Sequence, residues 1–187
     1  MKIIYSGGYQ RELEASYKNS WWYRHADILS SDIPTAVVTL AKPDGSYDQH
    51  LKKIPMVEVI DRNTTSVDWA KYKAVFIAGG PTDVLREEML KRDFDIRKLD
   101  HEAMVLGDSA GAYIMCSSFF TDSDGDPGKK VEFYEGFNPG AKNICVAHAD
   151  NPYYTNNLLI RQVTDFASEH SLEVVKLKEN EERILDI

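Results

Sequence analysis

The amino-acid sequence predicts an α/β fold, in which a mostly parallel β-sheet carries helices on both faces. Short runs rich in Val, Ile and Phe, typical of buried strands, alternate with stretches of helical periodicity. No linker rich in Pro, Gly and Ser interrupts the 187 residues, a length close to that of one domain. We therefore expect a single domain over residues 1–187.

Each expected strand is a short apolar run, and each expected helix is a longer amphipathic segment. The expected strands are Lys2–Tyr5, Thr35–Leu40, Met56–Val59, Ala74–Ile77, Ala103–Leu106, Asn143–Val146, Glu173–Leu177 and Arg183–Leu185. The expected helices are Leu13–Leu29, Pro81–Lys91, Ala110–Phe119 and Tyr154–Glu169. The segment 121–130 is dense in Asp, Gly and Ser, which predicts a surface loop.

Composition and charge exclude several classes of protein. The formal net charge is −8 and the basic residues are scattered, which disfavours nucleic acid as a partner. No apolar segment approaches the roughly 20 residues that span a bilayer, and the first residues do not form a signal-peptide pattern. Two cysteines are too few for a disulfide framework or a four-thiolate zinc site. We expect a cytoplasmic monomer or homodimer that uses no metal and no cofactor.

The segment Gly107-Asp108-Ser109-Ala110-Gly111 carries a Gly-x-Ser-x-Gly motif between an apolar strand and a helical pattern. This context is typical of a nucleophile elbow, a sharp turn that exposes a serine hydroxyl. Glycines are needed on both sides because side chains there would collide where strand and helix meet. We therefore expect Ser109 to be a nucleophile and the N–H of Ala110 to bind an oxyanion.

A serine nucleophile needs a base, and His148 is the best placed of the five histidines. It follows the apolar run that begins at Asn143, at the carboxyl end of an expected strand. The carboxyl ends of parallel strands form the edge at which such sheets bind ligands. The sequence thus predicts His148 as the catalytic base.

Two carboxylates are candidates for the group that would orient the imidazole, and the sequence does not decide between them. Asp124 lies in the acidic loop and Asp150 follows His148 by two residues, and either loop can reach the ring. Calcium binding by the acidic loop is disfavoured, because its Gly and Glu do not match the positions of an EF-hand loop.

Gly79 and Gly80 follow another expected strand and precede Pro81 at a helix start. Because glycine lets the backbone approach a ligand closely, either residue can supply a second oxyanion N–H. Pro81 has no N–H to donate. An ordinary glycine turn before a helix explains the segment equally well.

Together, the glycine pair before Thr82, the Gly-x-Ser-Ala-Gly-Ala segment, the downstream Asp and the strand that ends in His148 resemble the peptidase E family. The resemblance extends from about Ala74 to Ala167. It implies a class I glutamine amidotransferase-like fold, which is a flavodoxin-like three-layer sandwich. It also implies dipeptidase activity with Ser109 as nucleophile, His148 as base and Asp124, fifteen residues after the serine, as third member.

The sequence departs from this family after His148, where no Gly-Glu-Thr-Arg segment follows. In the family the arginine of that segment is thought to hold the substrate aspartate, so the aspartyl specificity does not carry over. Pro81 stands where the family has asparagine, and the family's longer C-terminal extension is missing.

The function that we expect is a serine peptidase that hydrolyses an amide bond of a dipeptide or small peptide. One alternative is a small esterase, because Gly-Asp-Ser-Ala-Gly also resembles hormone-sensitive-lipase relatives; no His-Gly-Gly-Gly segment precedes Ser109, however. The other is a non-catalytic binding module on the same fold. A glutamine amidotransferase is excluded, since its nucleophile is a cysteine.

Overall fold

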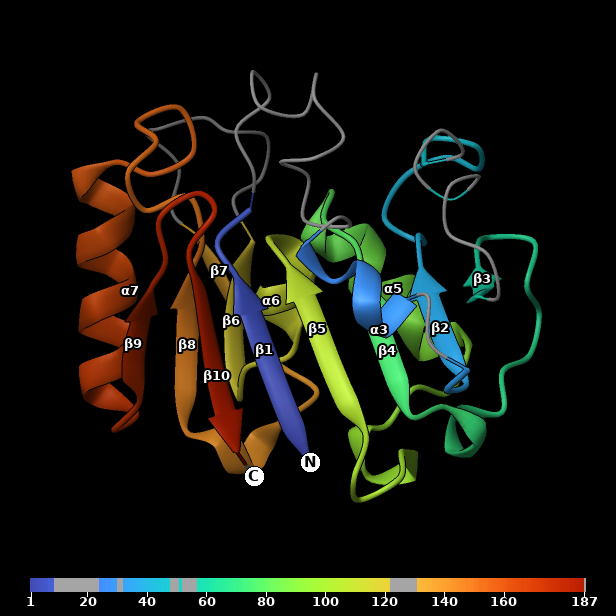
Figure 1. Cartoon of the computed structure of the whole chain (residues 1–187). Helices are drawn as coiled ribbons and strands as arrows, with labels where there is room; N and C mark the ends of the chain where they lie inside the picture. Colours follow the sequence, from blue (N-terminus) through green and yellow to red (C-terminus); the bar gives the residue numbers. More distant parts are fainter. Residues whose placement is uncertain (9–23, 30–31, 48–50, 52–56, 122–130, 187) are drawn as a thin grey trace.

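Two β-sheets lie side by side and form the framework of the molecule (Figure 1). The computed structural model describes residues 1–8, 24–29, 32–47, 51, 57–121 and 131–186. The larger sheet has the order β10-β1-β5-β4-β2-β3, and all its neighbours are parallel except β10 with β1. Its strands are β1 (Lys2–Ser6), β2 (Thr35–Val38), β3 (Val57–Ile60), β4 (Ala74–Ile77), β5 (Met104–Asp108) and β10 (Glu182–Asp186).

The smaller sheet has the order β7-β6-β8-β9, with β7 antiparallel to β6 and the other pairs parallel. Its strands are β6 (Ser118–Thr121), β7 (Glu132–Glu135), β8 (Asn143–Val146) and β9 (Glu173–Lys176). Tyr5 joins the two sheets: its hydroxyl donates to the carbonyl of Met115 at 3.1 Å and accepts from Asn143 Nδ2 at 3.2 Å.

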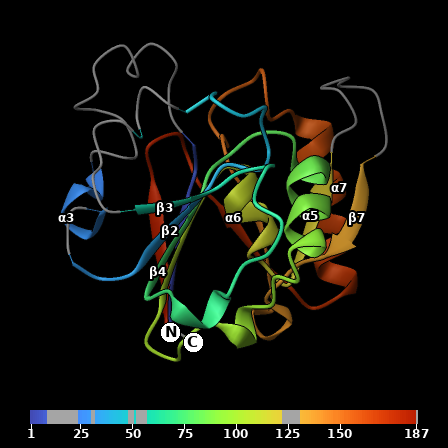
Figure 2. The same cartoon turned by 90° about the vertical axis from the view of Figure 1, so that its right-hand side faces the viewer.

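Helices cover both faces of the larger sheet (Figure 2). α3 (Ala26–Leu29) lies on one face, and α5 (Thr82–Lys91) and α6 (Ala110–Ile114) lie on the other. α7 (Asn157–Glu169) packs on the smaller sheet. Three short 3₁₀ helices, Trp69–Lys71, Ile96–Lys98 and Pro139–Ala141, complete the described elements. The fold is the α/β, flavodoxin-like sandwich that the sequence predicts.

The apolar core explains why the central strands read as continuous apolar runs. In β1, Ile3 and Tyr5 face the cluster that includes Leu85 of α5, whereas Ile4 faces the opposite cluster with Phe76. Since successive side chains of a strand point to opposite faces, burial on both faces requires apolar residues at every position.

The chain from Ala110 to Thr121 differs from the expected helix. α6 ends at Ile114, and Ser118–Thr121 forms strand β6. Phe119 packs in the cluster of the larger sheet and Phe120 in the cluster beneath α7, so two consecutive aromatic side chains use opposite faces. Neighbouring side chains point to opposite faces in a strand but not in a helix. Burial of both aromatic side chains therefore overrides the helical pattern of the preceding residues. Strand β7 was also not expected.

Most other elements differ from the expected ranges by a few residues at their ends. α7 begins at Asn157 because the side chain of Asn156 caps it, accepting from the N–H of Leu159 at 2.9 Å. Of the expected helix 13–29, the part up to residue 23 lies outside the described residues, as does most of the acidic loop after Thr121.

Candidate active site

Ser109 lies at a sharp turn between β5 and α6, with φ 51° and ψ −108°. Such a backbone conformation costs a non-glycine residue about 1–3 kcal/mol and persists only where the surroundings hold it. Part of that support is the hydrogen bond from the N–H of Ser109 to the carbonyl of Ser6, at 3.1 Å. The half-buried hydroxyl of Ser109 points toward His148.

The two glycines of the motif are required by contacts with their neighbours. A Cβ on Gly107 would lie 2.5 Å from the carbonyl carbon of Gly111, and one on Gly111 would lie 2.3 Å from the carbonyl oxygen of Ile77. Both distances are far below van der Waals contact. The strand and the helix can therefore approach each other only with glycine at both positions.

His148 lies two residues after the end of β8 and, like Ser109, has a positive φ of 51°. Its N–H donates to the carbonyl of Gly7 at 2.8 Å, and its Nε2 lies 3.0 Å from Ser109 Oγ. The imidazole stacks on Tyr154 with 4.3 Å between ring centroids. A Cβ at Gly8 would lie 2.1 Å from His148 Cε1, so only glycine leaves room for the ring.

The carboxylate at the other ring nitrogen belongs to Glu179, whose Oε1 lies 2.9 Å from His148 Nδ1. Glu179 is in the turn between β9 and β10, and its side chain is 6% exposed. Because a carboxylate only accepts hydrogen bonds, Nδ1 carries the proton and Nε2 is left to accept from the serine hydroxyl. Asn151 Nδ2 donates to the same Oε1 at 2.7 Å and fixes its position.

Asp150, one of the two carboxylates considered from the sequence, has a different contact. Its Oδ1 accepts from the backbone N–H of Glu179 at 2.9 Å, so it holds the turn that carries Glu179. Asp124, the other, lies outside the described residues. Glu179 is not among the residues that the sequence predicts for the site, although its position just after a strand that neighbours β8 is a signal comparable to that of His148.

Asp108 lies beside the nucleophile at the end of β5 and is 3% exposed. Its Oδ1 accepts from Ser6 Oγ at 2.7 Å. Burial raises the pKa of this carboxyl to about 6, against the lowering effects of the Ser6 hydrogen bond and of His148 and Arg24. Near neutral pH the site thus contains a buried carboxylate next to Ser109.

Two cavities meet at Ser109. The smaller, of about 240 Å³, is lined by Gly8, Lys42, Tyr47, Gly79, Gly80, Asp108, Ser109, His148 and Tyr154. The larger, of about 640 Å³, also includes Gly80, Ser109, His148 and Tyr154 and adds aromatic side chains such as Tyr113 and Phe120. The nucleophile is therefore accessible from both sides.

The residues expected to bind an oxyanion surround the serine. Gly79 lies close enough that a Cβ there would be 3.1 Å from Ser109 Cβ, and its carbonyl accepts from the hydroxyl of Tyr47 at 2.8 Å. Gly80 has φ 139°, where side chains are strained. Ala110 is the first residue of α6, so its N–H has no partner within the helix.

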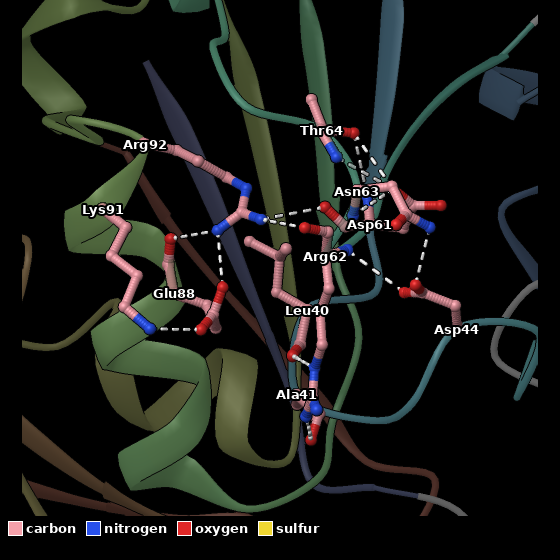
Figure 3. A network of polar contacts seen from close by, with 10 residues as sticks. All are labelled: Leu40, Ala41, Asp44, Asp61, Arg62, Asn63, Thr64, Glu88, Lys91 and Arg92. Carbon is pink, nitrogen blue, oxygen red and sulfur yellow. Dashed lines mark hydrogen bonds and ion pairs between the residues drawn. The ribbon is translucent and has the colours of Figure 1, made fainter.

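A polar network supports the cavity wall that carries Lys42 and Tyr47 (Figure 3). The guanidinium of Arg62 donates to the carbonyl of Leu40 at 3.1 Å and to that of Ala41 at 3.4 Å. Arg92, at the end of α5, donates in turn to the carbonyls of Asp61 and Arg62. The wall is thereby tied to α5 through the turn after β3.

Among the described residues, one cluster has the composition of a metal site: Asp100, His101 and Glu102. These residues precede β5, at the end of the strand opposite Ser109, and Asp100 already pairs with Lys73 at 2.6 Å. The cluster is therefore separate from the nucleophile. No described helix has the length and apolar character needed to cross a membrane.

Comparison with known proteins identifies the family. The model of peptidase family S51 matches residues 33–183. The chain belongs to peptidase family S51. The match runs from β2 to the first residues of β10 and includes Ser109, His148 and Glu179.

Solved structures of peptidases have the same fold. A candidate peptidase E protein from Listeria monocytogenes EGD-e has a TM-score of 0.62 at 13% identity, with 98% of this chain and 93% of that chain covered. A peptidase from an acI-B1 Actinobacterium has a TM-score of 0.52 at 12% identity, covering 98% and 82%. A search of the curated proteins finds no match. The fold class and the peptidase E resemblance inferred from the sequence are thus confirmed.

Proposed function

We propose that this S51 protein is a serine peptidase in which Ser109 is the nucleophile, His148 the base and Glu179 the group that orients the base. The observation that carries the proposal is the continuous path from Ser109 Oγ to His148 Nε2 at 3.0 Å and from Nδ1 to Glu179 at 2.9 Å. Both distances are within hydrogen-bond reach, as general-base activation of a serine requires. Glu179 takes the third place, instead of Asp124 or Asp150, because its carboxylate occupies Nδ1.

In this mechanism His148 removes the hydroxyl proton as Ser109 attacks the carbonyl carbon of the scissile amide. The proton then passes from Nε2 to the leaving amine, and water hydrolyses the acyl-enzyme by the same steps. The oxyanion receives hydrogen bonds from the N–H of Ala110 and from that of Gly79 or Gly80. A donor of this kind contributes on the order of 100-fold or more to the rate.

The size of the smaller cavity favours a short substrate. Its volume of about 240 Å³ is below the range of about 300–1,000 Å³ that holds a drug-sized ligand. A cavity of this size suits a single amino-acid residue. The larger cavity then holds the leaving part of the peptide. We therefore propose an exopeptidase or dipeptidase that removes one N-terminal residue, without assigning aspartate as that residue.

Two measurements test the proposal. Wild type is expected to react with a fluorophosphonate at Ser109 and to hydrolyse members of a dipeptide panel, whereas Ser109→Ala loses both. Ser168→Ala, on the exposed face of α7, is the matched control and keeps wild-type behaviour. Equal hydrolysis by Ser109→Ala and wild type would refute the proposal. Labelling accompanied by turnover of acyl esters alone would support an esterase, and no labelling by several probes would support a binding module.

A further inference from the structure

The proposed mechanism leaves the buried carboxylate of Asp108 without a role. The residue is only 3% exposed, yet it is among those that line the smaller cavity, together with Ser109 and His148. The positive charge of Arg24 lowers the pKa of the Asp108 carboxyl. The guanidinium of Arg24, however, already pairs with Glu182 at 3.4 Å and donates to the carbonyl of Asn180. Lys42, on the wall of the same cavity, has its ammonium over the ring of Tyr47 at 5.2 Å from the centroid.

An anion at this position opposes the reaction unless it is neutralised. The tetrahedral intermediate places a second negative charge next to Ser109, one residue from Asp108. Two like charges this close repel strongly, because water screens the buried carboxylate of Asp108 little. A positively charged group on the substrate would neutralise Asp108 and remove this repulsion, so that Asp108 contributes to substrate binding.

The geometry restricts which substrate cation can serve. In an N-terminal residue the amine nitrogen is about 2.5 Å from the carbonyl carbon, given standard N–Cα and Cα–C bonds. A carboxylate on the residue adjacent to the nucleophile suits that short separation, whereas a lysine or arginine side chain ends several bonds farther away. Gly79 keeps the space open, since a Cβ there would lie 3.1 Å from Ser109 Cβ and 3.7 Å from Asp108 Oδ2.

We propose that Asp108 binds the ammonium group of the substrate's N-terminal residue, so that the peptidase selects peptides with a free, protonated α-amine. This inference rests on the proposed peptidase function and names the residue that would restrict it to chain ends. Selection is expected to be strong, because a buried group built to bind a substrate N–H is left unpaired by an analogue that lacks it.

The test uses three forms of each peptide that wild type cleaves: the free amine, the N-acetylated form and the des-amino form, in which hydrogen replaces the amine. For wild type, kcat/KM for the free amine should exceed that of both others by on the order of 100-fold or more. Asp108→Asn keeps an acceptor for the Ser6 hydroxyl. In this variant kcat/KM for the free amine should exceed that of the other two forms by no more than about tenfold, while kcat/KM for the des-amino form stays the same or rises.

Asp165→Asn is the matched control, since Asp165 lies on α7 with a side chain that is 66% exposed, lines neither cavity, and loses the same charge. It should keep the full preference for the free amine. Wild type that cleaves all three forms equally, a preference kept in Asp108→Asn, or a preference lost equally in Asp165→Asn would overturn the inference while Ser109 still reacts with a fluorophosphonate. Absence of both labelling and cleavage would overturn the peptidase function, and this inference with it.

Discussion

Ser109 and His148 share an unusual backbone, since each has φ 51°. Each is also anchored to the end of β1: Ser109 N–H bonds the carbonyl of Ser6, and His148 N–H bonds the carbonyl of Gly7. Two consecutive carbonyls thus hold the two residues whose side chains must meet. This common anchor explains how a 3.0 Å contact is maintained between segments from different sheets.

At the level of single residues, Glu179→Gln is expected to lower kcat by about 10³–10⁴-fold. The amide can donate to Nδ1 and so favours the wrong tautomer of His148, which then cannot accept the serine proton. Asp150→Asn should have a much smaller effect, because its side chain contacts the backbone of Glu179 and not the ring. Steady-state kinetics on a cleaved dipeptide measures both; similar losses in the two variants would contradict the assignment.

Asp108 also predicts how stability depends on pH. Its folded pKa of about 6 lies above the ordinary 3.8, so the folded state holds the proton more tightly. This contribution to stability is present below about pH 4 and is lost as pH rises through 6, a change of about 3 kcal/mol. Asp108→Asn does not titrate, so its stability relative to wild type should rise by about that amount between pH 4 and 7. Urea unfolding at several pH values checks this, and parallel pH curves for both proteins would contradict it.

At the level of elements, the sequence predicted the strands with apolar runs on both faces, because burial dictates their composition. It also predicted that Ser109 and His148 follow such strands, and in the structure their side chains meet; their catalytic roles stay a prediction. It missed β6, where helical periodicity from α6 runs on into Ser118–Thr121. It missed Glu179, although this residue follows β9 much as His148 follows β8, because the contact between the two side chains depends on how β8 and β9 pair, which the local sequence does not give.

The link between α5 and the turn after β3 depends on Arg92, which is 6% exposed (Figure 3). Arg92→Met leaves Glu88 and the carbonyls of Asp61 and Arg62 without this donor, and should lower the free energy of unfolding by about 3 kcal/mol. Lys91→Met is the matched control: Lys91 pairs with the same Glu88, but its side chain is 63% exposed. A change within about 0.5 kcal/mol is expected there. Equal losses in urea unfolding would show that burial of Arg92 is not what matters.

At the level of the whole molecule, the two cysteines report whether the sheets separate. Cys116 leads into β6 and Cys145 lies in β8, and both are fully buried in the cluster of the larger sheet. The neighbouring Cys116 and burial raise the pKa of the Cys145 thiol well above its ordinary value, which lowers its reactivity further. Both thiols should react with a disulfide reagent at once in denaturant, and natively only at the rate of global unfolding. Rapid native reaction of either one would indicate local opening between the sheets.

The turn that supplies Glu179 is formed late in the order of synthesis. A ribosome that has passed codon 148 has produced the serine and the histidine but not the carboxylate that aligns them. Until residue 179 emerges and β9 pairs with β8, His148 Nδ1 lacks its carboxylate partner. In the proposed mechanism, a chain still attached to the ribosome would thus lack the group that orients the base.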